Sequence, residues 1–182
     1  INAHLKLHDR DPFVLRRDEA YIGVLIDDLI TKGTEEPYRM FTSRAEHRLL
    51  LRQDNADLRL TPVAREMGLI SDEHWMQFVE KSEAIRHEQR RLSGLTVLAD
   101  SEPGRLISQH LDRPLARDCK AGELLRRPEL DYRKLTGAIG GPVDTVTDQV
   151  AEQIEIQAKY AGYLERQTAE IEKARRHEQT RI

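Results

Sequence analysis

Regularly spaced arginines are the residues of this chain best suited to binding a charged ligand. Arg44, Arg48 and Arg52 recur every four residues, so on a helix they would form one row. A guanidinium is planar and can donate two parallel hydrogen bonds to a phosphate group. The spacing therefore predicts a row that could follow a nucleic-acid backbone. The same arginines could instead pair with nearby acids such as Glu46 and Asp57, and composition alone favours that interpretation.

The element that must hold this row is a helix beginning near residue 43. Thr42 or Ser43 can cap it, and Glu46 lies three residues beyond Ser43, which makes a capping box. The leucines at 49–51 supply apolar surface beside the arginines. The polar run 54–57 ends the helix, because such side chains bond to their own backbone.

Two other groupings of reactive side chains are weaker. Ser43, Glu46 and His47 are neighbours on one turn, whereas members of a hydrolytic triad usually come from separate segments. His4 and His8 have a spacing that can hold a metal on a helix, but no third ligand is evident. We expect a helix cap and exposed histidines, with no catalytic residue and no metal site.

Composition sets limits on the class of protein. The chain has 182 residues, a formal net charge of −3, 34% charged residues and 5% aromatic residues, so any nucleic-acid binding must come from a local patch. Cys119 is the only cysteine, which excludes an internal disulfide and is compatible with a cytoplasmic protein. With no histidine close in sequence, we expect it to be a small buried residue. No apolar run approaches the ~20 residues of a membrane helix.

The apolar pattern predicts an all-α fold, an irregular bundle of roughly seven helices with the longest at the C-terminus. Asp18 can cap an early helix that ends at residues 32–33. Its apolar residues fall at helical spacing and predict a face buried in the core. They are Ile22, Leu25, Ile26, Leu29 and Ile30.

Caps and helix breakers place the next helices. Thr61 caps a helix with Pro62 at its first position, and Ser71 caps a long helix that runs to about Ser93. The end of that long helix is basic, which suits the helix dipole without any ligand. Its basic residues are Arg86, His87, Arg90 and Arg91.

The second half is more broken. Two short helices are predicted near 105–111 and 121–126, followed by a loop at 137–141. Pro142 opens the last helix, and the only stretch that could be briefly extended is 58–60. The leucines of this half indicate a small leucine-filled cluster: Leu106, Leu111, Leu115, Leu124, Leu125, Leu130 and Leu135.

Gly162 lies between two tyrosines in the last predicted helix. A glycine there costs ~1 kcal/mol relative to alanine, so its presence predicts the close approach of another backbone between Tyr160 and Tyr163. The tyrosines could stack on a nucleic-acid base, although packing in the core is our preferred interpretation.

Three stretches resemble one family of enzymes. Residues 17–29, 36–60 and 160–163, the last together with 166–167, resemble the tRNA uridine-5-carboxymethylaminomethyl modification enzymes, MnmG or glucose-inhibited division protein A. The match is long and nearly gap-free at both ends of the chain and weak over 95–130.

The resemblance implies an enzyme that uses FAD and NADH and acts with a partner GTPase, MnmE. Together they would add carboxymethylaminomethyl to carbon 5 of the tRNA wobble uridine, as a homodimer within a heterotetramer. This chain is similar to the C-terminal helical portion. Residues 1–60 would be the edge of the flavin domain with the arginine helix, and residues 61–182 the C-terminal helical domain, truncated before the family's last small helical segment. The nucleotide-binding motif would lie upstream, so we expect no bound cofactor and no catalysis by this piece alone.

Within such a family, the stretch 36–60, which carries the arginines, becomes a predicted tRNA-binding site. The residues expected to contact tRNA phosphates are Arg39, Arg44, Arg48, Arg52 and Arg59. A second surface, for the tRNA or the partner, comprises Tyr160, Tyr163, Arg166 and Gln167. Two alternatives stay open: a scaffold that binds the GTPase or a second subunit without RNA contact, and, less favoured, a hydrolase built on Ser43 or Cys119.

Overall fold

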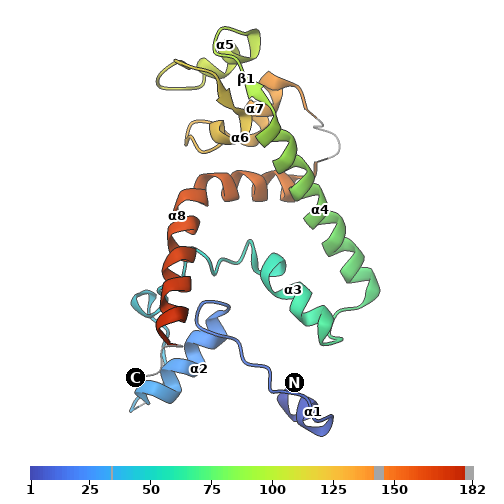
Figure 1. Cartoon of the computed structure of the whole chain (residues 1–182), viewed down its shortest axis with the longest axis vertical. Coiled ribbons are helices and arrows are strands. Elements are labelled where there is room, and N and C mark those ends of the chain that lie inside the picture. The colour runs from blue at the N-terminus through green and yellow to red at the C-terminus, as the bar shows by residue number, and fades with distance from the viewer. Residues whose placement is uncertain (34, 142–145, 179–182) are drawn as a thin grey trace. The chain divides into compact units, whose positions relative to one another are not determined.

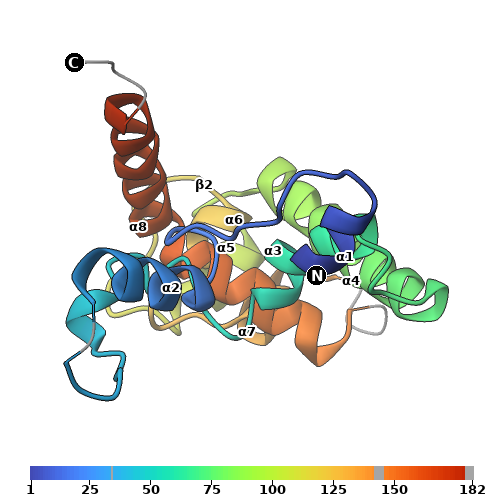
Figure 2. The ribbon, with the colours of Figure 1, turned by 90° about the horizontal axis from the view of Figure 1, so that it is seen from below.

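The computed structural model describes residues 1–33, 35–141 and 146–178, and these residues form a mostly helical protein (Figure 1). The described helices are α1 (Asn2–Leu7), α2 (Tyr21–Lys32), α3 (Ala56–Glu66), α4 (Asp72–Gly94), α5 (Glu102–Ser108), α6 (Ala121–Leu124), α7 (Tyr132–Ile139) and α8 (Asp148–Glu178). A short 3-10 helix, η1 (Thr42–Arg44), and two strands, β1 (Thr96–Val97) and β2 (Cys119–Lys120), complete the list. The predicted all-α fold with its long C-terminal helix is confirmed, as the orange-to-red helix α8 shows in Figures 1 and 2. None of the described helices is long and apolar enough to cross a membrane.

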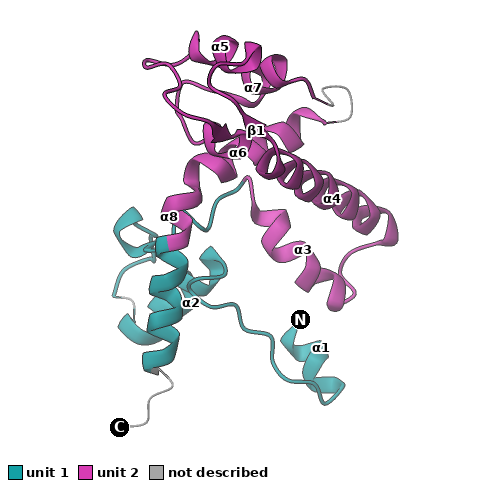
Figure 3. Ribbon diagram, turned by 45° about the horizontal axis from the view of Figure 1, so that its top comes forward, with its two compact units in different colours: residues 1–53, 166–182 teal, residues 54–165 magenta. Residues whose placement is uncertain are grey.

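The chain divides into two compact units (Figure 3). Unit 1 comprises residues 1–53 and 166–182, and unit 2 comprises residues 54–165. Helix α8 therefore contributes its first part to unit 2 and its last part to unit 1. The assignment of residues 1–60 to the edge of a flavin domain stays a prediction.

Unit 2 has a well-developed apolar core. Strand β1 pairs antiparallel with β2, with Thr96 opposite Lys120 and Val97 opposite Cys119. The predicted leucine cluster is confirmed except at Leu106, which is exposed. Each buried leucine contributes about 1.5–3 kcal/mol relative to an exposed one. The larger buried members of this core are Ile85, Leu92, Ile107, Leu111, Leu115, Leu124, Leu125, Leu130, Leu135 and Ile154.

A buried carboxylate is also part of unit 2. Glu88 on α4 is 1% exposed and accepts two hydrogen bonds from Arg91, each 2.7 Å long. The hydroxyl of Tyr132 on α7 donates to the same carboxylate at 2.8 Å. These hydrogen bonds raise the pKa of Arg91, and burial together with Glu88 raises that of Tyr132. The network ties α4 to α7, so Arg91 is not part of an exposed basic helix end.

Side-chain caps explain where several helices begin. Ser71 caps α4 as predicted, because its Oγ accepts a hydrogen bond from the backbone N–H of His74 at 3.3 Å. Asp131 caps α7 in the same way. That helix runs through residue 139, where a loop was predicted, and it ends at Gly140 with a φ of 69°. The loop predicted at 137–141 was therefore wrong for residues 137–139, which are helical, and right for residues 140 and 141.

The predicted start of the third helix was wrong. Helix α3 begins at Ala56, so Pro62 lies inside it and Thr61 does not cap it. Residues 58–60 are helical rather than extended. Helix α8 is described from Asp148, and the predicted start at Pro142 lies outside the described residues.

Helix α2 ends at Gly33 as predicted, at a φ of 67°, but it begins without its predicted cap. Asp18 instead pairs with Arg16 and Arg175 within unit 1. Gly23 is required here, since a Cβ at this position would lie 2.2 Å from the carbonyl oxygen of Arg16.

The predicted core face of α2 is wrong. The buried residues of this helix are Gly23, Val24 and Asp28. Its larger apolar residues are mostly exposed, and Ile30 is 77% exposed. A helical repeat of apolar residues identifies a face that can be covered, but not whether this chain covers it.

Candidate nucleic-acid interface

The segment that carries the predicted arginine row is not an α-helix. Within unit 1, the 3-10 helix η1 is followed by a run of turns through Leu50. Neither Thr42 nor Ser43 makes a side-chain cap. Arg44, Arg48 and Arg52 therefore do not form a helical row, and this part of the prediction was wrong.

A buried aspartate on α2 organises the segment instead. Asp28 is 1% exposed. It accepts hydrogen bonds from Arg17 Nη1 at 2.9 Å, Lys32 Nζ at 3.1 Å and the hydroxyl of Tyr38 at 3.0 Å. Arg44 Nη1 lies 3.8 Å from the same carboxylate. Asp28 therefore holds the start of the arginine segment against α2.

Burial alone would raise the pKa of Asp28. The hydrogen bonds from Arg17, Lys32 and Tyr38 outweigh it and hold the pKa down at about 2. The carboxylate is therefore ionised under ordinary conditions. Burial and Asp28 together raise the pKa of the Tyr38 hydroxyl.

Arg17 clamps the other end of the segment. Its Nε and Nη2 donate to the two carboxylate oxygens of Glu46 at 2.7 and 3.0 Å, and Nη2 also donates to the carbonyl of Arg44 at 3.1 Å. The hydrogen bonds to Glu46 raise the pKa of Arg17 and lower that of Glu46. Arg17 holds Glu46, so Glu46 does not complete the predicted capping box, and residues 45–50 are not helical.

Two guanidiniums lie against one exposed aromatic ring. Arg39 lies over Phe41 at 5.6 Å from the ring centroid, and Arg44 lies over the same ring at 5.7 Å and over Tyr38 at 5.6 Å. The Phe41 ring is 50% exposed. Cation–π contacts of this kind orient guanidiniums without neutralising them.

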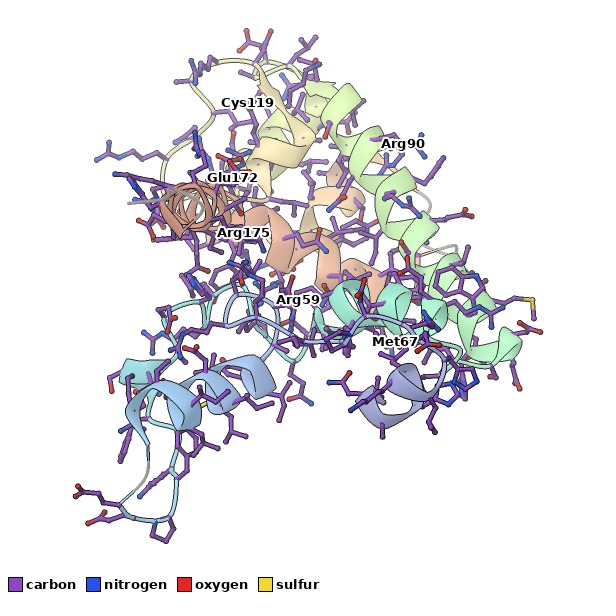
Figure 4. The ribbon with its side chains drawn as sticks, turned by 60° about the horizontal axis from the view of Figure 1, so that its bottom comes forward. Arg59, Met67, Arg90, Cys119, Glu172 and Arg175 are labelled. Atoms are coloured by element: carbon purple, nitrogen blue, oxygen red, sulfur yellow. The ribbon has the colours of Figure 1, made fainter. Side chains whose placement is uncertain are left out.

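The five predicted tRNA-binding arginines do not all lie in one unit. Arg39 and Arg48 are exposed in unit 1, and Arg44 is half-buried beside them. Arg52, also in unit 1, donates to the carbonyl of Leu49. Arg59 lies on α3 in unit 2 (Figure 4). Its Nε donates to Asn55 at 2.9 Å.

The second predicted surface lies on α8. Tyr160 and Tyr163 have ring centroids 6.5 Å apart and are both exposed, so packing in the core was the wrong interpretation. A Cβ on Gly162 would meet nothing within 4 Å, so the predicted close backbone approach is also wrong. Arg166 is exposed, whereas the amide of Gln167 donates to the carbonyl of Glu46 in unit 1 at 3.0 Å.

The remaining reactive residues form no recognised centre. His4 and His8 contact each other with ring centroids 4.2 Å apart. Among the described residues, no three histidine, cysteine or acidic side chains are grouped to hold a metal. Cys119 is half-buried rather than buried, and its Sγ lies 3.4 Å from the carbonyl oxygen of Arg117.

The sequence analysis missed the residues that shape this site. Arg17 and Asp28 lie outside the predicted segment, and their roles depend on contacts across 10 or more positions in the chain. An acid within the mostly apolar helix 21–32 was the available signal, because buried acids are nearly always paired.

The fold is that of a helical domain found in enzymes that modify tRNA. The family described as "tRNA modifying enzyme MnmG/GidA C-terminal helical domain" matches residues 72–168. The chain belongs to this family.

Two crystal structures of GidA from Aquifex aeolicus are similar to the whole chain. The form II crystal matches with a TM-score of 0.79 and 37% identity, covering 100% of this chain and 28% of that chain. The form I crystal matches with a TM-score of 0.76 and 37% identity, covering 100% of this chain and 27% of that chain. The chain thus spans little more than a quarter of the length of the GidA chains that it matches.

Proposed function

We propose that unit 1 binds the phosphate backbone of tRNA through the arginine segment, residues 36–53. The observation that carries this proposal is the pair of guanidiniums, from Arg39 and Arg44, on the exposed ring of Phe41. Arg48 adds a third exposed positive charge nearby in sequence. Arginine and aromatic side chains together are typical of surfaces that bind RNA.

The ion pairs of unit 1 support this interpretation. Asp28 on α2 and Glu46 in the segment are both engaged by Arg17, at 2.9 and 2.7 Å. Arg44 lies at the longer distance of 3.8 Å from Asp28. A guanidinium at that distance retains donors for a phosphate oxygen.

The family gives the segment its context. As part of an MnmG-type enzyme, this chain would contribute binding rather than redox chemistry. FAD, NADH and modification at carbon 5 of the wobble uridine would belong to the complete cytoplasmic enzyme with its partner GTPase. Residues 1–60 would form the junction with the flavin domain, and the complete enzyme would work as a homodimer in a heterotetramer.

The remaining predicted residues would add contacts outside the segment. Arg52 and Arg59 would supply weaker phosphate contacts, since each already donates a hydrogen bond within its own unit. The exposed rings of Tyr160 and Tyr163 would stack on bases or contact the partner, beside the exposed Arg166. Gln167 would act by positioning Glu46 rather than by touching the ligand.

Salt dependence of tRNA binding tests the proposal. Each phosphate contact that is lost should lower the slope of log affinity against log salt by ~0.7 to 0.9. Arg39→Ala and Arg48→Ala should each do so in the full-length enzyme. Arg10→Ala is the matched control, because Arg10 is also exposed in unit 1 but lies outside the segment. Slopes identical to that of the control would remove the RNA interpretation.

A specific observation favours a second function, the binding of a protein. The exposed apolar residues of α2, which include Ile22, Ile26 and Ile30, suit contact with another protein surface. Calorimetry of the chain with the partner GTPase, in the absence of RNA, separates the two. Heat of binding that Ile26→Ser abolishes, together with unchanged salt slopes for the arginine variants, would favour the scaffold.

A further inference from the structure

Unit 2 contains a hollow lined by three arginines that the sequence analysis did not single out. Its volume is about 440 Å3, and its charged lining residues are Arg113, Arg117, Arg127 and Glu123. Cys119 on β2 also lines it, and Figure 4 labels this residue. The hollow falls within the ~300–1,000 Å3 range of small-ligand sites.

The backbone that carries these arginines is anchored on both sides. Leu115 lies between Arg113 and Arg117, is buried, and donates its N–H to Ser108 Oγ at 3.1 Å. Asp118 then accepts a hydrogen bond from the N–H of Ala99 at 2.9 Å. The loop is therefore fixed against α5 and β1 while its arginines point away from the core.

The third arginine, Arg127, follows helix α6, and its backbone is held by that helix. Leu124 and Leu125 are each 1% exposed, and the N–H of Arg127 donates to the carbonyl of Leu124 at 3.1 Å. The three guanidiniums therefore come from two separately anchored segments. A site assembled in this way is preorganised, so binding costs less ordering of backbone.

The hollow carries excess positive charge. Its lining contains three arginines and one acid, Glu123, which gives a net charge of 3 − 1 = +2. Over the described ranges 1–33, 35–141 and 146–178, no ion pair joins Arg113, Arg117 or Arg127 to a carboxylate. The chain as a whole has a net charge of −3, so this concentration of unneutralised guanidiniums is local.

We propose that this hollow binds a phosphate group of an RNA backbone. A guanidinium fork matches the geometry of phosphate oxygens, and three arginines line this one hollow. Among the described residues that line the hollow, none is aromatic, so these residues offer no surface on which a base could stack. It would therefore contact the backbone, position the RNA and carry no sequence information. The choice of RNA as the source of the phosphate rests on the proposed function. The expectation that the hollow binds a phosphate anion rests instead on the arginines that line it.

Salt-dependent tRNA binding to the full-length enzyme, in which Arg39→Ala and Arg48→Ala are also measured, tests the hollow. Arg113→Ala and Arg117→Ala should each lower the slope of log affinity against log salt by ~0.7 to 0.9. Arg126→Ala should leave the slope unchanged. It is the matched control, because Arg126 is an exposed arginine next to Arg127 that does not line the hollow. Glu123→Gln should raise tRNA affinity, since it removes the one negative charge from the lining.

Cys119 gives a second readout that does not depend on affinity. It is the only cysteine in the chain and it lines the hollow. Saturating tRNA should slow its alkylation by neutral iodoacetamide, and pyrophosphate should do so as well. Arg117→Ala should remove both protections, whereas Arg126→Ala should retain them.

The outcomes distinguish this proposal from the proposed function. If Arg39→Ala and Arg48→Ala lower the slope, but Arg117→Ala has the same slope as Arg126→Ala, the proposal that the hollow binds phosphate is overturned. The proposal for unit 1 then stands. If Arg117→Ala lowers the slope but Arg39→Ala and Arg48→Ala do not, the proposal for unit 1 is overturned and the proposal for the hollow stands. Protection of Cys119 by pyrophosphate or by a glutamate-rich peptide, without protection by tRNA, would show that RNA is not the ligand and would overturn the proposal.

Discussion

The hydrogen bonds to Asp28 can be tested by one substitution, Asp28→Asn. The side chain is 1% exposed and accepts hydrogen bonds from Arg17, Lys32 and Tyr38. Asparagine keeps the shape but removes the charge that these donors stabilise. We expect the variant to lose much of the support that holds residues 38–46 against α2.

The magnitude follows from the pKa of Asp28. Its value of about 2 lies about two units below the ordinary ~3.9 of an aspartate, and each unit corresponds to ~1.4 kcal/mol. The ionised form therefore stabilises the fold by roughly 2–3 kcal/mol at neutral pH. Breaking a buried pair costs ~3–5 kcal/mol when a charge is left unpaired. Here Arg17 still has Glu46 and Asp27, so we expect a loss of about 2–4 kcal/mol.

Hydrogen exchange followed by mass spectrometry is the appropriate assay, because the two units can open separately. Peptides covering residues 17–32 and 38–46 should exchange faster in Asp28→Asn, and peptides from unit 2 should not. The matched control is Asp27→Asn. Asp27 also accepts from Arg17, at 2.8 Å, but its side chain is 45% exposed, so its loss should cost no more than ~1 kcal/mol. Equal exchange in the two variants would refute the reasoning.

The effect of pH has a defined sign. A lowered pKa means that the stabilisation by Asp28 is fully present above ~3.9 and is lost as the pH falls through about 2. The difference between the native chain and Asp28→Asn should therefore shrink between pH 4 and pH 2. A difference that stays constant over that interval would contradict the assigned cause.

Three further substitutions have expected outcomes. Gly23→Ala should destabilise unit 1 strongly, because the new Cβ would lie 2.2 Å from the carbonyl oxygen of Arg16; hydrogen exchange of residues 15–24 checks this. Glu88→Gln should destabilise unit 2 by ~1.5–3 kcal/mol, measured by urea unfolding, because the negative charge is lost and one of the two oxygens that accept from Arg91 and the Tyr132 hydroxyl becomes a donor; an unchanged midpoint would contradict this. Ser71→Ala should cost ~1 kcal/mol in the same assay, and Ser71→Asp, which can still cap, should not.

The features that sequence could predict are those determined by neighbouring residues. The cap at Ser71 and the apolar repeat beyond it predicted α4, and Gly33 marked the end of α2. Such signals act over one or two helical turns. The leucine cluster of unit 2 was predicted because leucines recur through residues 106–135, although α5, α6 and α7 carry only one leucine each.

The features that it could not predict depend on distant contacts. The prediction of an arginine helix depended on a capping box by Glu46, but Arg17, 29 residues earlier, binds that carboxylate instead. The face of α2 was assigned to the core because periodicity does not reveal what covers it. The hollow was missed because Arg113 and Arg117 lie in a loop and Arg127 follows α6, ten residues later, so that only the folded chain brings all three to one hollow.

Photo-crosslinking of tRNA to the full-length enzyme tests the central claim most directly. With 4-thiouridine-containing tRNA and mass spectrometric mapping, the peptide that spans Arg39 to Arg48 should carry crosslinks, and Phe41→Ala should reduce them by removing the ring that orients two guanidiniums. Crosslinks absent from that peptide in a complex that forms and modifies tRNA normally would contradict the account.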